Sequence, residues 1–433
     1  MTASAPRPPA QDRAFGLEFY QSRTPGVAGR TKASPDDFRV TEISNYPMPD
    51  PAGAFSVLRV QSRDWEQHEL GQAIARRLGL PSASVQWAGT KDRRAVAERL
   101  LSYRGPLPSG ELGLPRVVVL DAYTARDGLV LGHHFGNAFE IRVAELTVPP
   151  AEALKAFRAT ERELRSAGHW PNFFGPQRFG EVRPVTHEVG REVVRGDLAA
   201  AVEMYLVALP PGTPDGVGDT ARRTYARTHD AARALGEFPS HYRFERSLLE
   251  RLARGDPPER AFRALARELR LLFVHAFQAL LFNRWLSRRH AEGLPFDRPV
   301  PGDCILRLGR DGTVRSQEGI PVSADNEREC SELVERRGAL LAGPLVGYET
   351  PSVEGPAGTI LEQLLREEGV TRAMFRLPAT PEIASRGAWR PAVLPVPPLG
   401  LTSEPTGLWF RFGLPKGAYA TVLMREFLKT GAE

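Results

Sequence analysis

Cysteine, paired histidines and long apolar runs are all scarce in this 433-residue chain. Its two cysteines, Cys304 and Cys330, lie far apart and near no histidine cluster, so we expect neither a disulfide framework nor a zinc site. The nine histidines form no HxH, HxxxH or HExxH pair, so we expect no bound metal. No apolar run approaches the length that spans a bilayer, and the N-terminus lacks the apolar core of a secretory signal. We therefore expect a cytoplasmic protein without a membrane partner.

Lysine is scarce too, since only five of the 57 basic residues are lysines. The net charge of +5 is compatible with a polyanionic partner but does not establish one. A chain that prefers arginine so strongly can keep lysine where a compact ammonium does what a guanidinium cannot. Lys32, Lys91 and Lys416 all fall in the motifs described below. The alternative is that they merely survive a compositional bias.

The first part of the chain alternates strand-like and helix-like segments. Residues 38–43 alternate apolar and polar side chains with period two, as do residues 55–60 less cleanly, which predicts two strands. We expect a helix that opens at Asp64, has Gln67 as its capping-box partner and stops at Gly79. The hydrophobic fraction of 42% and the length are those of a globular protein with two domains.

From about residue 186 onward, helical patterns separated by Pro/Gly breaks dominate the sequence, until a strand at 408–412 resembles the first part again. This change from alternating strand-like and helix-like segments to mainly helical patterns, and back, predicts an insertion. We expect a flexible tail at 1–14, a discontinuous domain at 15–197 plus 394–433, and an inserted domain at 198–393.

Two motifs carry candidate chemistry in the first half. Asp92 follows a short predicted strand and is flanked by Lys91 and Arg93, whose charges favour an ionised carboxylate. A solvated turn is the alternative for this triplet. The second motif, at 171–180, reads PNFFGPQRFG and mixes aromatic rings with amides and an arginine. Such groups suit a flipped nucleobase, although a Phe-rich plug between helix and sheet would read alike.

Two further motifs pair a lysine with an aromatic residue in a loop beside a strand. One is SPDDFRVTEI, with Phe38, preceded by Lys32; the other is LPKGAYATVLMREF, with Lys416 and Tyr419. Read alone, either could be ordinary loop chemistry, with Phe38 in the core and Tyr419 in the first turn of a helix.

Together with AGTKDRRAV and PNFFGPQRFG, these motifs resemble the TruD family of tRNA pseudouridine synthases, in the family's order. The resemblance implies an α+β fold: a catalytic domain with a mixed, mostly antiparallel sheet, interrupted by an inserted, largely helical α/β domain. It also implies an isomerase that turns uridine into pseudouridine without a cofactor, with tRNA as partner. We expect a monomer.

The resemblance further implies roles for six residues. Asp92 is the catalytic carboxylate. Phe38, Asn172 and Tyr419 contact the target nucleotide, Phe174 stacks on the base, and Lys32 competes with Lys91 and Arg93 as the cation that keeps Asp92 ionised. The usual target of the family is uridine 13 of tRNA. Two alternatives stay open: another RNA as substrate, or a tRNA-binding or folding protein in which catalysis is not essential.

Overall fold

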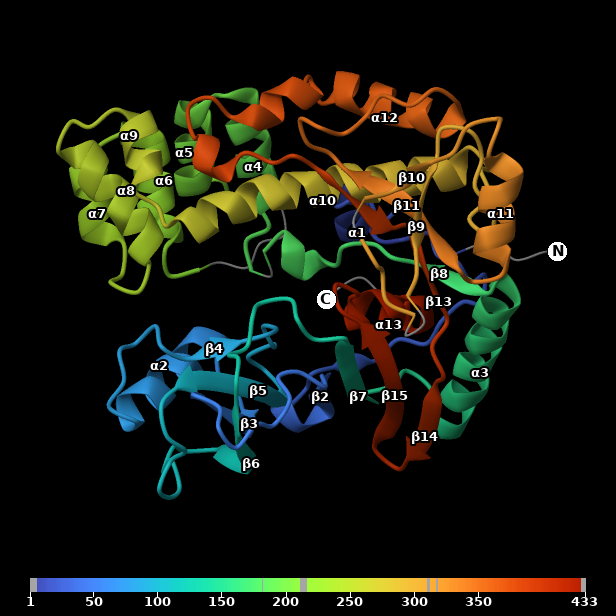
Figure 1. The fold of residues 1–433 in the computed structure, drawn as a ribbon. Helices are drawn as coiled ribbons and strands as arrows, with labels where there is room; N and C mark the ends of the chain where they lie inside the picture. The colour runs from blue at the N-terminus through green and yellow to red at the C-terminus, as the bar shows by residue number, and fades with distance from the viewer. Residues whose placement is uncertain (1–5, 181, 211–215, 310–311, 317, 430–433) are drawn as a thin grey trace.

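A mixed sheet forms the lower half of the molecule in Figure 1. The computed structural model describes residues 6–180, 182–210, 216–309, 312–316 and 318–429. Within them, the strands of this sheet are β14 (Gly400–Glu404), β15 (Gly407–Pro415), β7 (Gly136–Ala144), β2 (Phe38–Ile43), β5 (Val96–Arg104), β3 (Phe55–Arg63) and β6 (Val117–Ala125), in that spatial order. Two short strands pair at its sides, β1 (Arg30–Thr31) with β7 and β4 (Gln86–Trp87) with β5. Only β2 and β5 run parallel, so the predicted mixed, mostly antiparallel sheet is confirmed.

Three helices pack on this sheet. Helix α2 (Gln67–Arg77) places Leu70 and Ile74 in one core cluster with β3 and β5. Helices α3 (Pro150–Ala167) and α13 (Ala420–Leu428) hold the rings of Phe157 and Phe427 against Phe410 of β15, at centroid distances of 5.1 Å each. The apolar faces of these helices thus fix the position of the last strands of the chain.

The upper half of the molecule is mainly helical, and the long helix α10 (Arg267–Ala291) crosses it in Figure 1. The other helices described in this half are α4 (Thr186–Arg195), α5 (Leu198–Val207), α6 (Asp219–Thr228), α7 (Ala231–Glu237), α8 (Arg243–Ala253), α9 (Pro258–Arg263), α11 (Glu327–Glu335) and α12 (Pro356–Glu367). A small sheet joins β10 (Ile320–Pro321), β9 (Cys304–Arg307), β11 (Ala339–Leu345) and β12 (Ala388–Pro391). Short 3-10 turns are η1 (Pro35–Asp37), η2 (Pro176–Arg178), η3 (Arg372–Arg376) and η4 (Pro381–Ile383). None of the helices described is long and apolar enough to cross a membrane.

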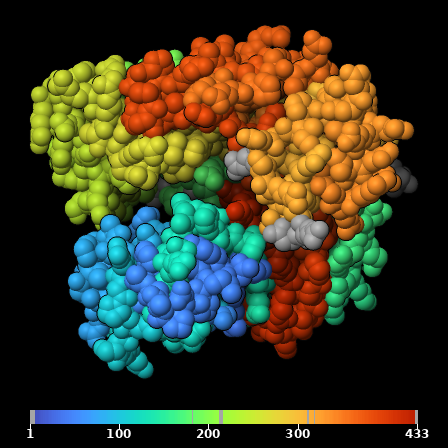
Figure 2. Space-filling view, viewed as in Figure 1, coloured from blue at the N-terminus to red at the C-terminus, as the bar shows by residue number. Residues whose placement is uncertain are grey.

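The two halves meet where the chain leaves the sheet domain and returns to it. Strand β8 (His169–Pro171) pairs with β13 (Val393–Pro395), which brings residues more than 200 positions apart side by side. Figure 2 shows a groove between the blue and cyan surface of the sheet domain and the yellow-green helices. The predicted boundaries at 197/198 and 393/394 stay a prediction.

The structure differs from the sequence-based expectations at the start of α2. The helix begins at Gln67 and not at Asp64, because Asp64 has a φ of 57°, outside helical geometry, and Glu66 caps the helix by accepting hydrogen bonds from the amides of His68 and Glu69. Strand β5 had no counterpart in the expected elements.

A second difference concerns the N-terminus, where a flexible tail was expected. Residues Ala10–Ala14 form helix α1, and the buried Asp12 accepts a hydrogen bond from Arg425 of α13. Arg425 also donates to the carbonyl oxygen of Phe19 at 2.9 Å, so the described part of this segment is anchored to the last helix.

Candidate active site

The loop between β4 and β5 presents Asp92. Its geometry is tight at Gly89, where a β-carbon would stand 2.9 Å from the imidazole of His134 and 3.0 Å from the ammonium of Lys91. The loop also hydrogen bonds to the segment before β7, since the amide of Gly132 donates to the carbonyl oxygen of Ala88 at 2.7 Å. Asp92 therefore lies in a loop that follows the end of a strand and that neighbouring residues hold in place.

The carboxylate of Asp92 pairs with Lys32. Lys32 Nζ lies 2.5 Å from Asp92 Oδ2 and 4.3 Å from the centroid of the Phe38 ring. The side chain of Asp92 is 41% exposed, so a substrate can reach it, whereas that of Lys32 is only 18% exposed. The backbone of Lys32 adopts a left-handed conformation with a φ of 55°, which is uncommon for a residue other than glycine. Three of the predicted site residues thus form one cluster.

Lys91 makes a different ion pair, although it is next to Asp92 in sequence. Its Nζ lies 2.7 Å from Glu42 Oε2, and both side chains are almost completely buried, at 2% and 1% exposure. Burial lowers the pKa of the Lys91 ammonium, which Glu42 opposes. Arg93 is exposed. Of the three cations considered in the sequence, Lys32 is the one in contact with Asp92.

The remaining predicted site residues, Asn172, Phe174 and Tyr419, form a second cluster. The rings of Phe174 and Tyr419 meet edge to face at 5.9 Å. Tyr419 accepts a hydrogen bond from Arg178 Nε at 3.2 Å through its hydroxyl oxygen. A β-carbon on Gly175 would stand 3.2 Å from the Tyr419 ring, so the glycine lets the PNFFGPQRFG and LPKGAYAT motifs pack closely.

Asn172 is buried and bonded within the protein. Its Nδ2 donates to the carbonyl oxygen of Pro391 at 2.9 Å, and its Oδ1 accepts from Arg390 Nη2 at 2.8 Å. The guanidinium carbon of Arg390 lies 4.1 Å from the centroid of the Phe174 ring and covers one of its faces. The nucleotide contacts of Asn172 and Phe174 stay a prediction.

One segment links the two clusters. Lys416 donates through its backbone amide to Phe135 at 2.9 Å and through Nζ to the carbonyl oxygen of Gly132 at 2.7 Å. Gly132 in turn bonds to the loop of Asp92, as described above. Among the described residues no hydrogen bond or ring contact joins Asp92 directly to Phe174 or Tyr419.

Reasoning from the sequence missed Glu42 and Arg390. Glu42 stands inside the DDFRVTE motif, where a carboxylate on the same strand as Phe38 is the only signal. Arg390 lies in a Pro-rich stretch with no pattern that marks it. In the described part of the chain, no three histidine, cysteine or acidic side chains gather into a group that could hold a metal ion.

Comparison with known proteins agrees with the motifs. The family model for tRNA pseudouridine synthase D (TruD) matches residues 14–427. A probable tRNA pseudouridine synthase D of Halobacterium salinarum is 38% identical over 435 residues, covering 96% of this chain and 97% of the relative. One of Thermococcus onnurineus is 35% identical over 422 residues, with 96% and 99% covered.

A solved structure is similar over nearly the whole chain. It is the crystal structure of the putative tRNA pseudouridine synthase D (TruD) from Methanosarcina mazei, with a TM-score of 0.81, 30% identity and 98% of each chain covered. The family resemblance and the α+β fold expected from the sequence are therefore confirmed.

Proposed function

The chain belongs to the TruD family and is a tRNA pseudouridine synthase, and from this premise we propose that it isomerises uridine 13 of tRNA with Asp92 as the catalytic carboxylate. The observation that carries the proposal is the pairing of a partly exposed Asp92 with Lys32, at 2.5 Å, in a loop fixed on both sides. The ion pair with Lys32 holds the carboxylate that acts on the substrate as a nucleophile or a base.

The reaction is an isomerisation in which the proton on C5 leaves to solvent and N1 of the uracil takes up a proton. The N-glycosidic bond of uridine breaks, the uracil turns, and C5 forms a bond with C1′ of the same ribose. The carboxylate of Asp92 acts on C1′, on C6 of the base or on the proton at C2′. No cofactor enters any of these steps. Each of them requires the base outside its stack, in a pocket from which water is excluded.

The substrate-binding roles follow the two clusters. Phe38 lies beside the ion pair of Lys32 and is only 3% exposed, so we assign its ring to the support of Lys32, with any contact to the nucleotide made through its small exposed edge. Tyr419 and Phe174 meet edge to face. Phe174 is only 7% exposed, with the guanidinium carbons of Arg390 and Arg178 at 4.1 and 5.4 Å from its ring centroid, so stacking of the base on Phe174 requires one of these guanidinium groups to give way. Asn172 contributes to nucleotide binding in one of two ways. It fixes the backbone around it, or its side chain donates or accepts a hydrogen bond beyond those it makes with Arg390 and Pro391.

The groove of Figure 2 is the proposed path of the tRNA. It separates the sheet domain from a helical half rich in arginine. Contacts between arginines and RNA phosphates increase the affinity, which falls as the salt concentration rises, but they contribute little sequence specificity. A monomer that works in the cytoplasm fits this substrate and completes the proposal.

A tritium-release assay on tRNA labelled at uracil C5 tests the proposal. We expect release by the wild type and a loss of at least about 1,000-fold with Asp92→Asn, because the amide is no nucleophile or base. Asp121→Asn, a change at an exposed aspartate on β6, serves as the matched control and keeps full activity. An Asp92→Asn enzyme as active as the wild type would exclude Asp92 as the catalytic group.

Mapping the modified nucleotide decides the substrate. Pseudouridine at position 13 of tRNA supports the proposal, and modification at another position or in another RNA replaces it with a synthase of different specificity. A wild type that binds tRNA but releases no tritium from any RNA would favour a binding or folding protein.

A further inference from the structure

Arg390 is an unusual buried arginine. It lies on β12, within the predicted inserted domain, and is only 9% exposed. No described carboxylate lies within ion-pair distance of it. Burial lowers the pKa of its guanidinium to about 10. A buried cation without a counter-ion costs stability unless its hydrogen bonds are satisfied, so the acceptors that surround Arg390 show what holds it in place.

The hydrogen bonds of Arg390 converge on two motifs of the catalytic domain. Its Nη2 donates to Asn172 Oδ1 at 2.8 Å, to the carbonyl oxygen of Asn172 at 3.1 Å and to that of Gly417 at 2.9 Å. Its Nε donates to the Asn172 carbonyl oxygen at 3.2 Å. One guanidinium therefore fixes the spacing between the segment that precedes Phe174 and the segment that precedes Tyr419.

Residues of β12 and α10 also hold the Phe174 ring. The guanidinium of Arg390 lies over it at 4.1 Å, and the ring of Phe282 on α10 meets it edge-on at 5.6 Å. Asn283, also on α10, accepts a hydrogen bond from the backbone amide of Phe174 at 2.8 Å and donates to its carbonyl oxygen at 3.0 Å. Groups of α10 and β12 thus determine where the stacking ring stands, although the ring belongs to the catalytic domain.

We propose that Arg390 is a positioning residue, which sets the distance and orientation between Phe174 and Tyr419 and so couples the inserted domain to the geometry of the target nucleotide. The inference rests on the proposed function of these two rings. A planar fork is required because one side chain must reach acceptors on two segments while lying flat on an aromatic face. A lysine keeps the charge but cannot satisfy this geometry.

The test compares Arg390→Lys with Arg289→Lys. Arg289 is a matched control because it is completely buried and its fork bonds to Asp303 and to the carbonyl oxygen of Pro295, both within the predicted inserted domain. Single-turnover and steady-state tritium release give kcat and KM on tRNA, and a thermal scan gives the fraction folded. We expect Arg390→Lys to lower kcat per folded molecule by at least about tenfold with KM within about threefold, because misplaced groups slow the chemistry and leave phosphate contacts intact. Arg289→Lys keeps kcat.

Every outcome bears on the assignment. Equal kcat in wild type and Arg390→Lys, or equal losses in Arg390→Lys and Arg289→Lys, overturns it. If Arg390→Lys does not fold, Arg390→Met fills the same space over Phe174 without donors and is expected to show the same loss of kcat. Failure of both variants to fold where Arg289→Lys folds makes Arg390 a residue of stability alone and also overturns the assignment. An inactive wild type would contradict both the proposed function and this inference. An active wild type together with an active Arg390→Lys would contradict only the inference about Arg390.

Discussion

At the scale of single residues, the lysines of the motifs have separate partners. Lys32 pairs with Asp92, Lys91 with Glu42, and Lys416 with the carbonyl oxygen of Gly132. The sequence indicated that these lysines matter but not what each one contacts, because the contacts depend on backbone turns. Lys32 contacts a residue 60 positions away and has a left-handed φ, and no local pattern in the sequence marks either feature. The same holds for Arg390, whose partners come from both sides of the predicted insertion.

The ion pair of Lys91 and Glu42 provides a prediction at this scale. Glu42→Gln leaves the ammonium of Lys91 buried without a counter-ion, so the free energy of unfolding should fall by about 3–5 kcal/mol. Urea denaturation at neutral pH measures the change. Glu145→Gln is the matched control, because its pair with Arg30 is exposed, at 63% and 56%, and should cost less than about 1 kcal/mol. Similar small changes in both variants would show that the buried pair contributes no more than a surface pair.

At the scale of elements, regular patterns predicted the structure well and irregular ones did not. Strand β2 lies where the alternation at residues 38–43 predicted it. Strand β5 was missed because VAERLLSYR buries side chains on both faces near its end, which removes the alternation of a half-buried strand. Tertiary contacts also moved the start of α2, where Glu66 caps the helix in place of Asp64.

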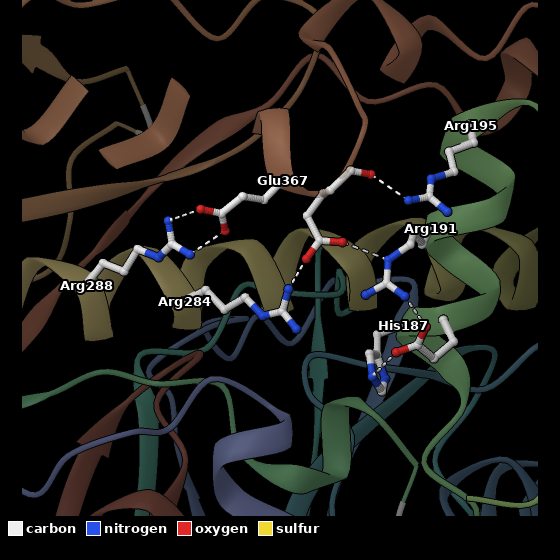
Figure 3. A network of polar contacts seen from close by, with 8 residues as sticks. His187, Arg191, Arg195, Arg284, Arg288 and Glu367 are labelled. Atoms are coloured by element: carbon white, nitrogen blue, oxygen red, sulfur yellow. Dashed lines mark hydrogen bonds and ion pairs between the residues drawn. The ribbon is translucent and has the colours of Figure 1, made fainter. Parts of the chain in front are cut away.

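The end of α12 illustrates how elements of the helical half are joined. Glu368, directly after α12, contacts arginines of α4 and α10, and Figure 3 labels these arginines as Arg191, Arg195 and Arg284. Arg191 Nε donates to its Oε2 at 2.8 Å, Arg284 donates to Oε1, and Arg195 donates to its backbone oxygen at 2.7 Å. Glu367, one position earlier, pairs with Arg288 at the surface.

These neighbouring glutamates allow a matched comparison. Glu368→Gln should lower the free energy of unfolding by about 3 kcal/mol, the lower end for a broken buried pair, because Arg191 keeps Glu188 and Arg284 is partly exposed. Glu367→Gln should cost less than about 1 kcal/mol. Chemical denaturation of both variants gives the two values. Equal costs would mean that burial of Glu368 adds nothing to the docking of α12.

At the scale of the whole molecule, buried histidines predict a dependence of stability on pH. Burial lowers the pKa of His134 and of His169 below the usual 6.5. Below about pH 6.5 the unfolded chain therefore binds protons that the folded chain does not bind. The contribution of these histidines to the free energy of unfolding is fully present above about pH 6.5 and is lost as the pH falls through the lowered pKa values. Glutamates with lowered pKa, such as Glu188, titrate below their usual 4.5 and stay outside this window.

Thermal scans at pH 7.5 and pH 5.5 test this prediction, with a lower Tm expected at pH 5.5. His169→Gln should reduce the drop, because His169 Nε2 is buried with no hydrogen-bond partner among the described residues and its protonation would add an unpaired donor. The same drop in wild type and variant would assign the pH dependence to other groups.

The position of β15 between β14 and β7 has a consequence for synthesis of the protein. Strand β7 ends at Ala144, but its partner runs from Gly407 to Pro415, so most of the chain must be translated between the two. At about 5–20 residues per second, the ribosome takes on the order of tens of seconds to do so. During that time the edge of β7 is unpaired and open to other strands. The sheet whose β4–β5 loop carries Asp92 is therefore completed only near the end of translation.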